Sequence, residues 1–156
     1  MRVPCLVLFL SLFFATPALA QGSGGSWEFG LGPHVVFRES SSKTNVGGGV
    51  TVARRYQRFA AVVEGSGTRR EGHNDWRIIG GPRVMVNAGA RTSVFVQALA
   101  GTLIRQREAD WAVLPGFGVD VRWDGRRAIR AQFDAPIERS QGRTATSIRG
   151  SVWFVF

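Results

Sequence analysis

Apolar and polar residues alternate along most of the chain downstream of residue 20, and no stretch there keeps the period of a helix. The clearest example runs from Ala128 to Glu138, where Ile129 and Phe133 share one face and Arg130 and Asp134 share the other. Clusters of Gly, Ser, Asn, Asp and Arg interrupt the alternation at intervals, as turns between strands do. The pattern predicts an all-β protein.

Eight alternating segments of about ten residues lie between the turn signals. An outer-membrane strand needs about 9–11 residues at its usual tilt, and bacterial single-chain barrels have even strand numbers from eight upward. We therefore predict one domain, an eight-stranded antiparallel up-and-down transmembrane β-barrel. The predicted strands are Trp27 to Arg38, Val46 to Arg54, Phe59 to Thr68, Trp76 to Val86, Ser93 to Arg105, Trp111 to Trp123, Ala128 to Glu138 and Ala145 to Phe156.

The predicted connections alternate in length. Those after the second, fourth and sixth strands are tight and basic, whereas Glu39 to Asn45 and Arg69 to Asp75 are longer polar segments, interpreted as solvated loops. Outer-membrane barrels usually have short periplasmic turns and longer external loops. The alternation therefore predicts that both termini lie on the periplasmic side.

Aromatic residues fall at both ends of the predicted strands. Amphipathic rings favour the headgroup level of a bilayer, so these residues predict two aromatic girdles. Trp27 and Trp123 belong to the periplasmic girdle, and Trp76 and Trp111 belong to the external one.

Alternation alone does not tell which face is buried, because a soluble barrel alternates too. An eight-stranded barrel is just wide enough for side chains to fill it, and the charged face carries acids and arginines that can pair there, with glycines that leave room. The other face is apolar to an extent that normally marks a membrane or partner surface. We therefore predict that lipid meets the apolar face and that a polar network plugs the interior. The predicted network comprises Glu64, Arg77, Arg83, Asp120, Arg122, Arg130, Gln132, Asp134 and Arg149.

The first twenty residues have the features of a secretory signal peptide. Arg2 precedes an apolar run from Val3 to Ala15, and small residues lead up to Ala20. The run is too short for a membrane-spanning helix of about 20 residues. We predict export by the Sec route, cleavage after Ala20 and a barrel domain over residues 21–156. Loss of Cys5 then excludes disulfides, thiolate metal sites and cysteine nucleophiles.

The chain has a formal net charge of +9, and all its basic residues except Lys43 are arginines. Strong basicity raises nucleic acid as a partner, but export and the scatter of the arginines argue against it. Arginines in the predicted periplasmic turns suit anionic lipid headgroups. The external arginines suit lipopolysaccharide phosphates, although acids such as Glu71 and Asp75 dilute that signal and favour plain solvated loops. Outer-membrane lipid is thus the predicted partner, with lipopolysaccharide as a candidate.

Short motifs follow one another along the predicted strands: Ala61 to Gly65 (AVVEG), Gly80 to Arg83 (GGPR), Val94 to Gly101 (VFVQALAG), Gly116 to Val121 (GFGVDV) and Ile129 to Asp134 (IRAQFD). In this order and spacing the chain resembles the outer-membrane β-barrel domain family, which includes small eight-stranded barrels of the OmpX and OmpA type. The resemblance implies an outer-membrane location in a Gram-negative type of envelope.

The closing segment adds to the resemblance. It looks like the terminal signal read by the barrel assembly machinery, which implies that machinery and periplasmic chaperones as partners during biogenesis. The residues of this signal are Gly150, Val152, Phe154 and Phe156. One departure follows Asp134, where the family often has Tyr and this chain has Ala135 and then Pro136. Proline cannot donate to a ladder, so a bulge or bend is expected there.

Two histidines raise the question of catalysis. Some eight-stranded outer-membrane barrels modify lipid A with His-dependent sites, but the His-x-Ser motif of the deacylases is missing. His34 is interpreted as a lumen residue and His73 as a solvated loop residue, and no cluster has metal-ligand spacing. We predict a non-enzymatic protein without cofactor or metal and with a structural or surface-interaction role. The alternatives are a small channel, a soluble periplasmic lipid-binding barrel and a lipid A-modifying enzyme.

Overall fold

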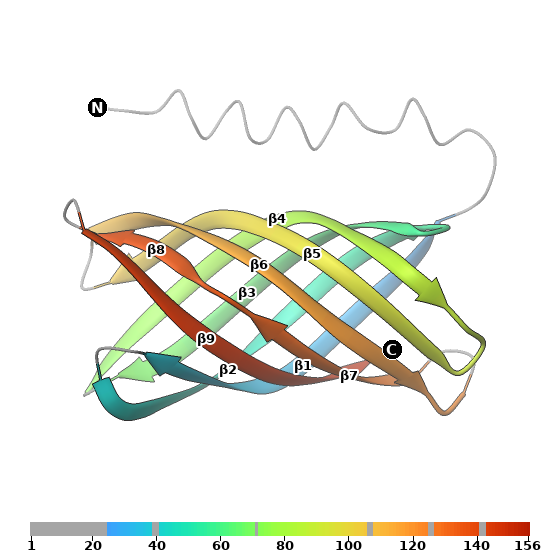
Figure 1. The fold of residues 1–156 in the computed structure, drawn as a ribbon, viewed down its shortest axis with the longest axis horizontal. Coiled ribbons are helices and arrows are strands. Elements are labelled where there is room, and N and C mark those ends of the chain that lie inside the picture. Colours follow the sequence, from blue (N-terminus) through green and yellow to red (C-terminus); the bar gives the residue numbers. More distant parts are fainter. Residues whose placement is uncertain (1–24, 39–40, 71, 106–107, 125–126, 141–142) are drawn as a thin grey trace, which may run out of the picture.

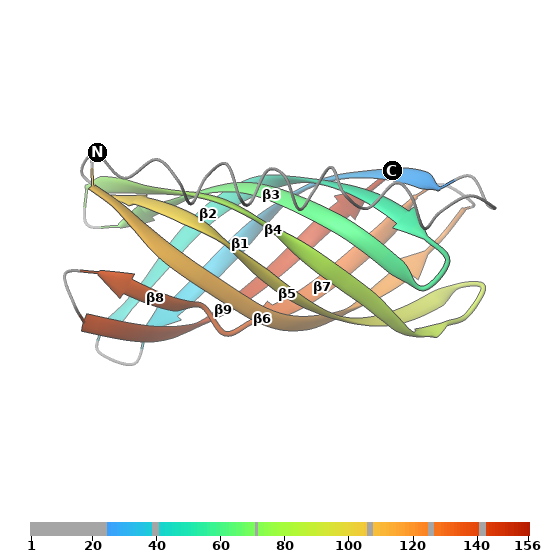
Figure 2. The ribbon, with the colours of Figure 1, turned by 90° about the horizontal axis from the view of Figure 1, so that it is seen from above.

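The computed structural model describes residues 25–38, 41–70, 72–105, 108–124, 127–140 and 143–156. The signal peptide predicted over residues 1–20 lies outside the described residues. The described chain forms one antiparallel sheet that closes on itself, because β1 pairs with β9 as well as with β2 (Figures 1 and 2). No helix in the described part of the chain is long and apolar enough to cross a membrane.

Consecutive strands are neighbours in the barrel wall, as in an up-and-down barrel. Register shifts occur between Val36 and Arg38 in β1 and between Met85 and Asn87 in β4. The strands are β1 (Ser26–Arg38), β2 (Ser41–Tyr56), β3 (Phe59–Arg70), β4 (His73–Ala88), β5 (Thr92–Arg105), β6 (Glu108–Arg122), β7 (Ala128–Asp134), β8 (Ile137–Ser140) and β9 (Arg143–Val155).

Pro136 interrupts the seventh stave of the barrel without shifting its register. β7 and β8 both lie between β6 and β9, so together they form one stave. The pairs Gly116↔Asp134 and Val113↔Ile137 are in the same register on the two sides of the break. The bulge expected at Pro136 is therefore absent, and the ladder lapses because proline has no N–H to donate. The barrel has eight staves, which confirms the predicted eight-stranded antiparallel fold.

The register gives the barrel a stagger of ten residues. Following cross-strand partners once around the wall leads from Ser26 to Val36 on the same strand. Eight staves with this stagger tilt by roughly 40° from the barrel axis, which is the oblique course that Figures 1 and 2 show. The residues on the path are Ser26, Arg55, Ala60, Arg83, Gln97, Gly116, Asp134, Arg149 and Val36.

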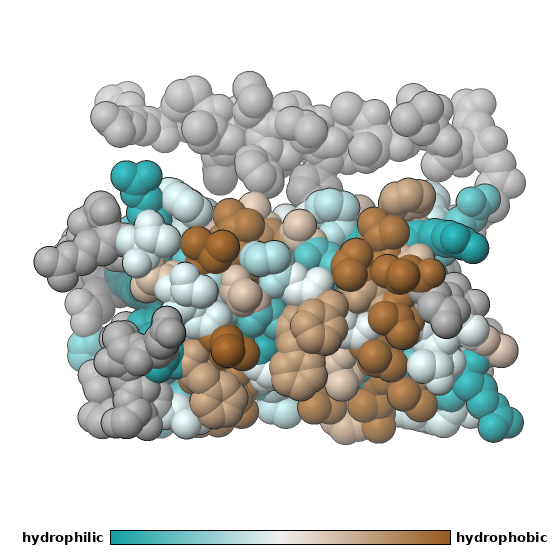
Figure 3. All heavy atoms as spheres, in the orientation of Figure 1, coloured by the Kyte–Doolittle hydropathy of each residue, from teal (hydrophilic) through white to brown (hydrophobic). Residues whose placement is uncertain are grey.

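Side chains alternate between the two faces of the wall. In β7 every second residue is buried, so that Ile129 is 40% exposed on the outside while Arg130 is 1% exposed inside. Exposed apolar side chains such as Phe117 and Phe133 cover the outside, and Figure 3 shows hydrophobic residues over the wall of the barrel in that view. The polarity is thus inside out with respect to a soluble barrel.

The strands reach further than predicted at one end of the barrel. We call the end that carries Ser26 and Phe156 the proximal end and the opposite end the distal end. β2 begins at Ser41 and β4 at His73, so most of the two segments interpreted as distal loops belongs to strands. Two residues separate the strands at each distal link, whereas five separate β6 from β7 at the proximal end. The predicted contrast in connection length is therefore wrong, because polar side chains on both faces of the distal rim hide the alternation there.

Candidate functional site

The candidate site is the interior of the barrel, where the structure brings most of the predicted polar residues together. Arg122 is the exception, because it is half-buried at the proximal mouth and has no ion pair with a described residue. The other eight are buried: Glu64, Arg77, Arg83, Asp120, Arg130, Gln132, Asp134 and Arg149.

Arg149 lies at the centre of the network. Its Nη1 and Nη2 donate to the two carboxylate oxygens of Glu64, the second at 3.1 Å. Its Nε and Nη2 donate to Oδ2 of Asp134 at 2.9 and 2.7 Å. Arg149 is on β9 and Glu64 on β3, so this pair crosses the lumen. Bidentate contacts of this kind combine charge with fixed geometry.

Two glutamines bind Asp134 in this centre, and one of them connects the centre to a second arginine. Gln97 accepts hydrogen bonds from Nε and Nη2 of Arg83, both at 3.0 Å, and donates to Oδ1 of Asp134 at 3.1 Å. Gln132 donates to Oδ2 of Asp134 at 3.0 Å. The two amides thereby supply hydrogen bonds to buried atoms of Arg83 and Asp134, and a buried polar network is stable only when its polar atoms have such partners.

A second cluster lies toward the proximal end. Arg130 donates from Nε and Nη2 to Asp120 at 2.6 and 2.9 Å, and its Nη2 also lies 3.2 Å from Glu28. The guanidinium groups of Arg83 and Arg130 lie 4.6 and 5.0 Å from the ring centre of Phe95, which is fully buried. These cation–π contacts help to hold two like charges in one small space.

A third cluster lies toward the distal end, and sequence reasoning missed its centre. Glu138 accepts from Arg38 at 3.0 Å, from Arg77 at 2.7 Å and from Arg105. Arg105 also donates to Asp75 at 3.1 Å. Asp75 is buried, which overturns its interpretation as a solvated loop residue. Glu138 is an even number of residues away from Arg130 and Asp134 in the same predicted strand. This spacing could have predicted that Glu138 points into the barrel with them.

The three clusters balance their charges. Apart from Arg55 at the proximal mouth, the ion pairs among the described interior residues join six arginines to six carboxylates. Buried charges are tolerated only when paired and hydrogen-bonded. The arginines are Arg38, Arg77, Arg83, Arg105, Arg130 and Arg149, and the carboxylates are Glu28, Glu64, Asp75, Asp120, Asp134 and Glu138.

Apolar side chains occupy another part of the interior, along β3 to β6. These residues are fully or almost fully buried and form one contiguous cluster. Sequence reasoning missed them because the segments that carry them have apolar residues on both faces, most clearly in β5, so alternation does not tell which face points inward there. The cluster includes Val62, Ile79, Leu99, Leu103 and Leu114.

Glycines on the inner face make room for the larger side chains. A Cβ on Gly116 would overlap the carboxylate of Asp134 and lie 2.8 Å from the carbonyl oxygen of Phe133. A Cβ on Gly118 would overlap the ring of Phe95. These two positions therefore fix where Asp134 and Phe95 can lie.

The histidines do not form a catalytic arrangement in the described residues. His34 is buried, and its Nε2 lies 2.8 Å from Oγ1 of Thr68. His73 is exposed at the first position of β4. In the described part of the chain no group of three or more His, Cys, Asp or Glu side chains is arranged to hold a metal ion.

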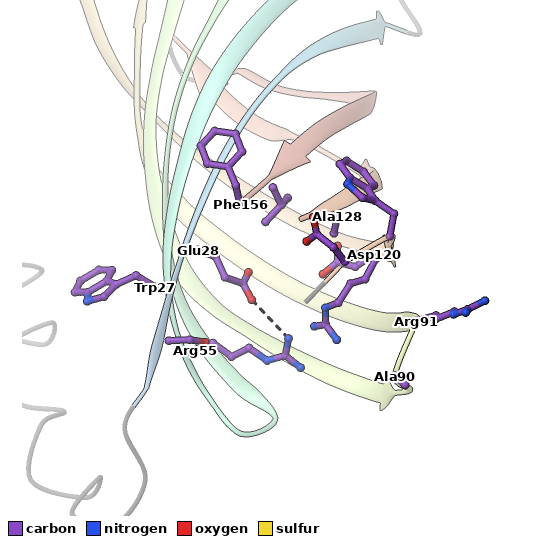
Figure 4. A pocket seen from close by; sticks show the side chains of 13 residues that line it. Trp27, Glu28, Arg55, Ala90, Arg91, Asp120, Ala128 and Phe156 are labelled. Atoms are coloured by element: carbon purple, nitrogen blue, oxygen red, sulfur yellow. Dashed lines mark ion pairs between the residues drawn. The ribbon is translucent and has the colours of Figure 1, made fainter. Parts of the chain in front are cut away.

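A hollow of about 650 Å³ opens at the proximal mouth. Glu28, Arg55 and Asp120 point into it, whereas Trp27 points out of the barrel (Figure 4). Arg55 lies 3.6 Å from Glu28. The proximal charged cluster borders this hollow, because Glu28 and Asp120 line it and both bind Arg130.

The aromatic residues predicted as girdles are all exposed on the outside, with Trp27, Trp76, Trp111 and Trp123 between 47% and 57% exposed. Trp27 and Phe37 lie ten residues apart on β1. A rise of about 3.3 Å per residue and a tilt of roughly 40° separate these two rings by about 25 Å along the barrel axis. That is about the height of the apolar band of outer-membrane barrels.

The carboxyl-terminal residues close the barrel. Val152, Phe154 and Phe156 are exposed on the outside, and Gly150 lies on the same face. The backbone N–H and carbonyl of Phe156 both bond to Phe29 at 2.9 Å, which joins the end of the chain to β1.

The chain matches no protein-family model, and no curated protein matches its sequence. Solved structures do match its fold. Neisserial surface protein A (NspA) has a TM-score of 0.64 at 7% identity over 85% of this chain and 95% of its own. Ail of Yersinia pestis, in complex with the heparin analogue sucrose octasulfate, has a TM-score of 0.57 at 13% identity over 86% of this chain and 100% of its own. The N-terminal β-barrel domain of Pseudomonas aeruginosa OprF has a TM-score of 0.52 at 12% identity over 85% of this chain and 99% of its own. The chain therefore has the fold of the small eight-stranded outer-membrane β-barrels.

Proposed function

We propose that this chain is a non-enzymatic integral protein of the Gram-negative outer membrane, with a sealed interior and a structural or surface-interaction role in the envelope. The observation that carries the proposal is the inside-out polarity of a closed barrel. Charged clusters occupy much of the interior, and apolar side chains such as Phe117, Phe133 and Ile78 are more than half exposed on the outside.

A lipid environment explains the outer surface better than water does. Exposed apolar patches of this extent normally mark a membrane or partner surface. β1 pairs with β9, so the sheet of described strands has no open edge. An open edge would expose unpaired backbone N–H and carbonyl groups, to which lipid cannot form hydrogen bonds. An even number of staves brings Ser26, where β1 begins, and Phe156 to the proximal end, which we assign to the periplasmic side by resemblance to the family.

The interior contacts favour a sealed barrel over a channel. Arg149 binds Glu64 across the lumen, Arg77 on β4 binds Glu138 on β8, and the apolar cluster that includes Leu99 occupies another part of the interior. An eight-stranded barrel is about wide enough for its side chains alone. Ion flow would require several of these buried pairs to separate, at a cost of several kcal/mol each.

A surface role draws on the fold and on two neighbours. NspA is named a surface protein, and Ail an attachment protein that binds a sulfated heparin analogue. At the distal end only two residues link consecutive strands, so the strand ends themselves form the rim of the barrel. Contacts with other molecules would therefore be made by residues at these strand ends. Arg69 and Arg139 are exposed there.

Two measurements on purified protein and cells test the proposal. In fractionated cells the chain is expected in the detergent-extracted outer membrane, and recovery from the soluble periplasm would contradict the membrane assignment. In a planar bilayer the purified protein is expected to give no discrete openings. Steady openings would favour the channel alternative and overturn the sealed interior.

A further inference from the structure

Arg54 is a charged residue in a part of the outer surface whose neighbouring side chains are apolar. It is exposed on the outer face of β2, directly opposite Trp27 of β1 and Ala61 of β3. Among the strand side chains described as exposed on the outer face, the other charged residues are Arg69 and Arg139, and both belong to the distal rim. Arg54 is therefore the one strand arginine of this kind near the proximal end.

Two aromatic rings hold the Arg54 guanidinium. Its Cζ lies 5.4 Å from the ring centre of Trp27 and 5.2 Å from that of Tyr56. Tyr56 is half-buried, and a Cβ added to Gly25 would lie 2.8 Å from Cε1 of its ring, so Gly25 packs near that ring. Contacts to ring faces fix the position of a guanidinium while its in-plane N–H groups stay free to donate.

No carboxylate of the described residues neutralises Arg54, whereas the interior arginines are joined to acids. Its outward neighbours are Trp27, Phe29, Val52, Ala61 and Phe59, none of which carries charge. A guanidinium in such surroundings has an anion site open to whatever molecule covers the outer wall.

The level of Arg54 identifies that molecule. Trp27 belongs to the predicted periplasmic aromatic girdle at the proximal end. Arg54 is its cross-strand partner, so both lie at the same edge of the apolar wall. At that edge of a bilayer the anions within reach are lipid phosphates, which guanidinium groups bind in a bidentate manner.

We propose that Arg54, held between Trp27 and Tyr56, binds the phosphodiester of a glycerophospholipid in the periplasmic leaflet. The inference rests on the proposed membrane function and adds a specific lipid site to it. The site uses the outer faces of β1 and β2 and is separate from the interior network.

Native mass spectrometry of the detergent-solubilised barrel tests the site, with phosphatidylglycerol as the probe. The substitution Arg54→Gln removes the charge, and we expect about tenfold weaker phosphatidylglycerol binding because a charge-assisted contact is lost. A glucosyl diacylglycerol with the same acyl chains but no phosphate should bind equally to both proteins. Equal phosphatidylglycerol binding by the variant, or an equal loss of the glycolipid, would overturn the site.

Two further variants separate the site from general charge. Arg127→Gln removes an exposed arginine at the same end whose charge Asp124 already neutralises, and it should weaken phosphatidylglycerol binding far less than Arg54→Gln does. Trp27→Leu keeps Arg54 but removes one ring, and it should weaken binding. A loss in Arg127→Gln as large as in Arg54→Gln would contradict the proposal. A wild-type chain that never folds into a barrel in detergent would contradict the proposed function instead.

Discussion

Arg149 of β9 and Glu64 of β3 meet across the barrel lumen, with two guanidinium nitrogens donating to two carboxylate oxygens. The strands that carry them are not neighbours in the wall. Asp134 binds the same guanidinium, so one arginine links β9 with β3 and β7. This contact therefore connects opposite sides of the barrel wall through the interior.

Removing one partner of this contact should be costly. We expect Glu64→Gln to lower the free energy of unfolding by about 3 kcal/mol, because a buried guanidinium loses a charged partner in a site closed to water. Urea titration of the barrel refolded in lipid vesicles measures the change.

Asp124→Asn is the matched control, since Asp124 pairs with Arg127 on an exposed turn. Exposed pairs contribute about 0–1 kcal/mol, so the control should stay within that range. Similar small effects for both variants would mean that the interior pair is not a structural brace.

Gly116 should not tolerate a methyl group. A Cβ there would overlap the Asp134 carboxylate and crowd the Phe133 carbonyl, and overpacking of this kind costs about 1–3 kcal/mol. Gly48→Ala adds the same methyl on the outside, where the nearest atom is 3.5 Å away. We expect the control to be neutral or slightly stabilising, by the same urea titration. Equal costs at both positions would contradict the close packing inside.

An arginine on the outer wall should destabilise the barrel according to its depth. Phe117 lies midway between Trp111 and Trp123 in sequence and is 57% exposed, whereas Val121 is 52% exposed near the proximal end. In a bilayer, Phe117→Arg should cost about 2–4 kcal/mol and Val121→Arg about 0–1 kcal/mol. Unfolding titrations in vesicles give both values. A barrel whose outer wall faces water would show no such difference.

The sequence was informative where one face is charged and the other apolar. In β7 that pattern runs from Ile129 to Asp134, so alternation places Arg130 and Asp134 on one face. The apolar extent of the opposite face then assigned them to the inside. β5 has apolar residues on both faces, and its inward residues Leu99 and Leu103 were missed for that reason. Alternation tells which side chains share a face only when the two faces of a strand differ in polarity.

The distal half of the site was less predictable. Pro136 breaks the ladder just before Glu138, and from the sequence alone such a break could change which side chains point inward. The register continues across it, so Glu138 still points inward. Asp75 sits among polar residues that resemble a loop, although β4 already includes it. Burial of a charge through a partner such as Arg105, 30 positions away, is a tertiary property.

Gel electrophoresis tests most directly whether the chain forms a closed barrel in the outer membrane. An outer-membrane fraction is extracted with detergent, and samples in SDS are run unheated and boiled. We expect the protein in this fraction, with an unheated band that migrates differently from the boiled one because the closed barrel resists SDS until it is heated. Recovery in the soluble periplasm without a heat-dependent shift would contradict the account, and the apolar outer wall would then need a different partner from lipid.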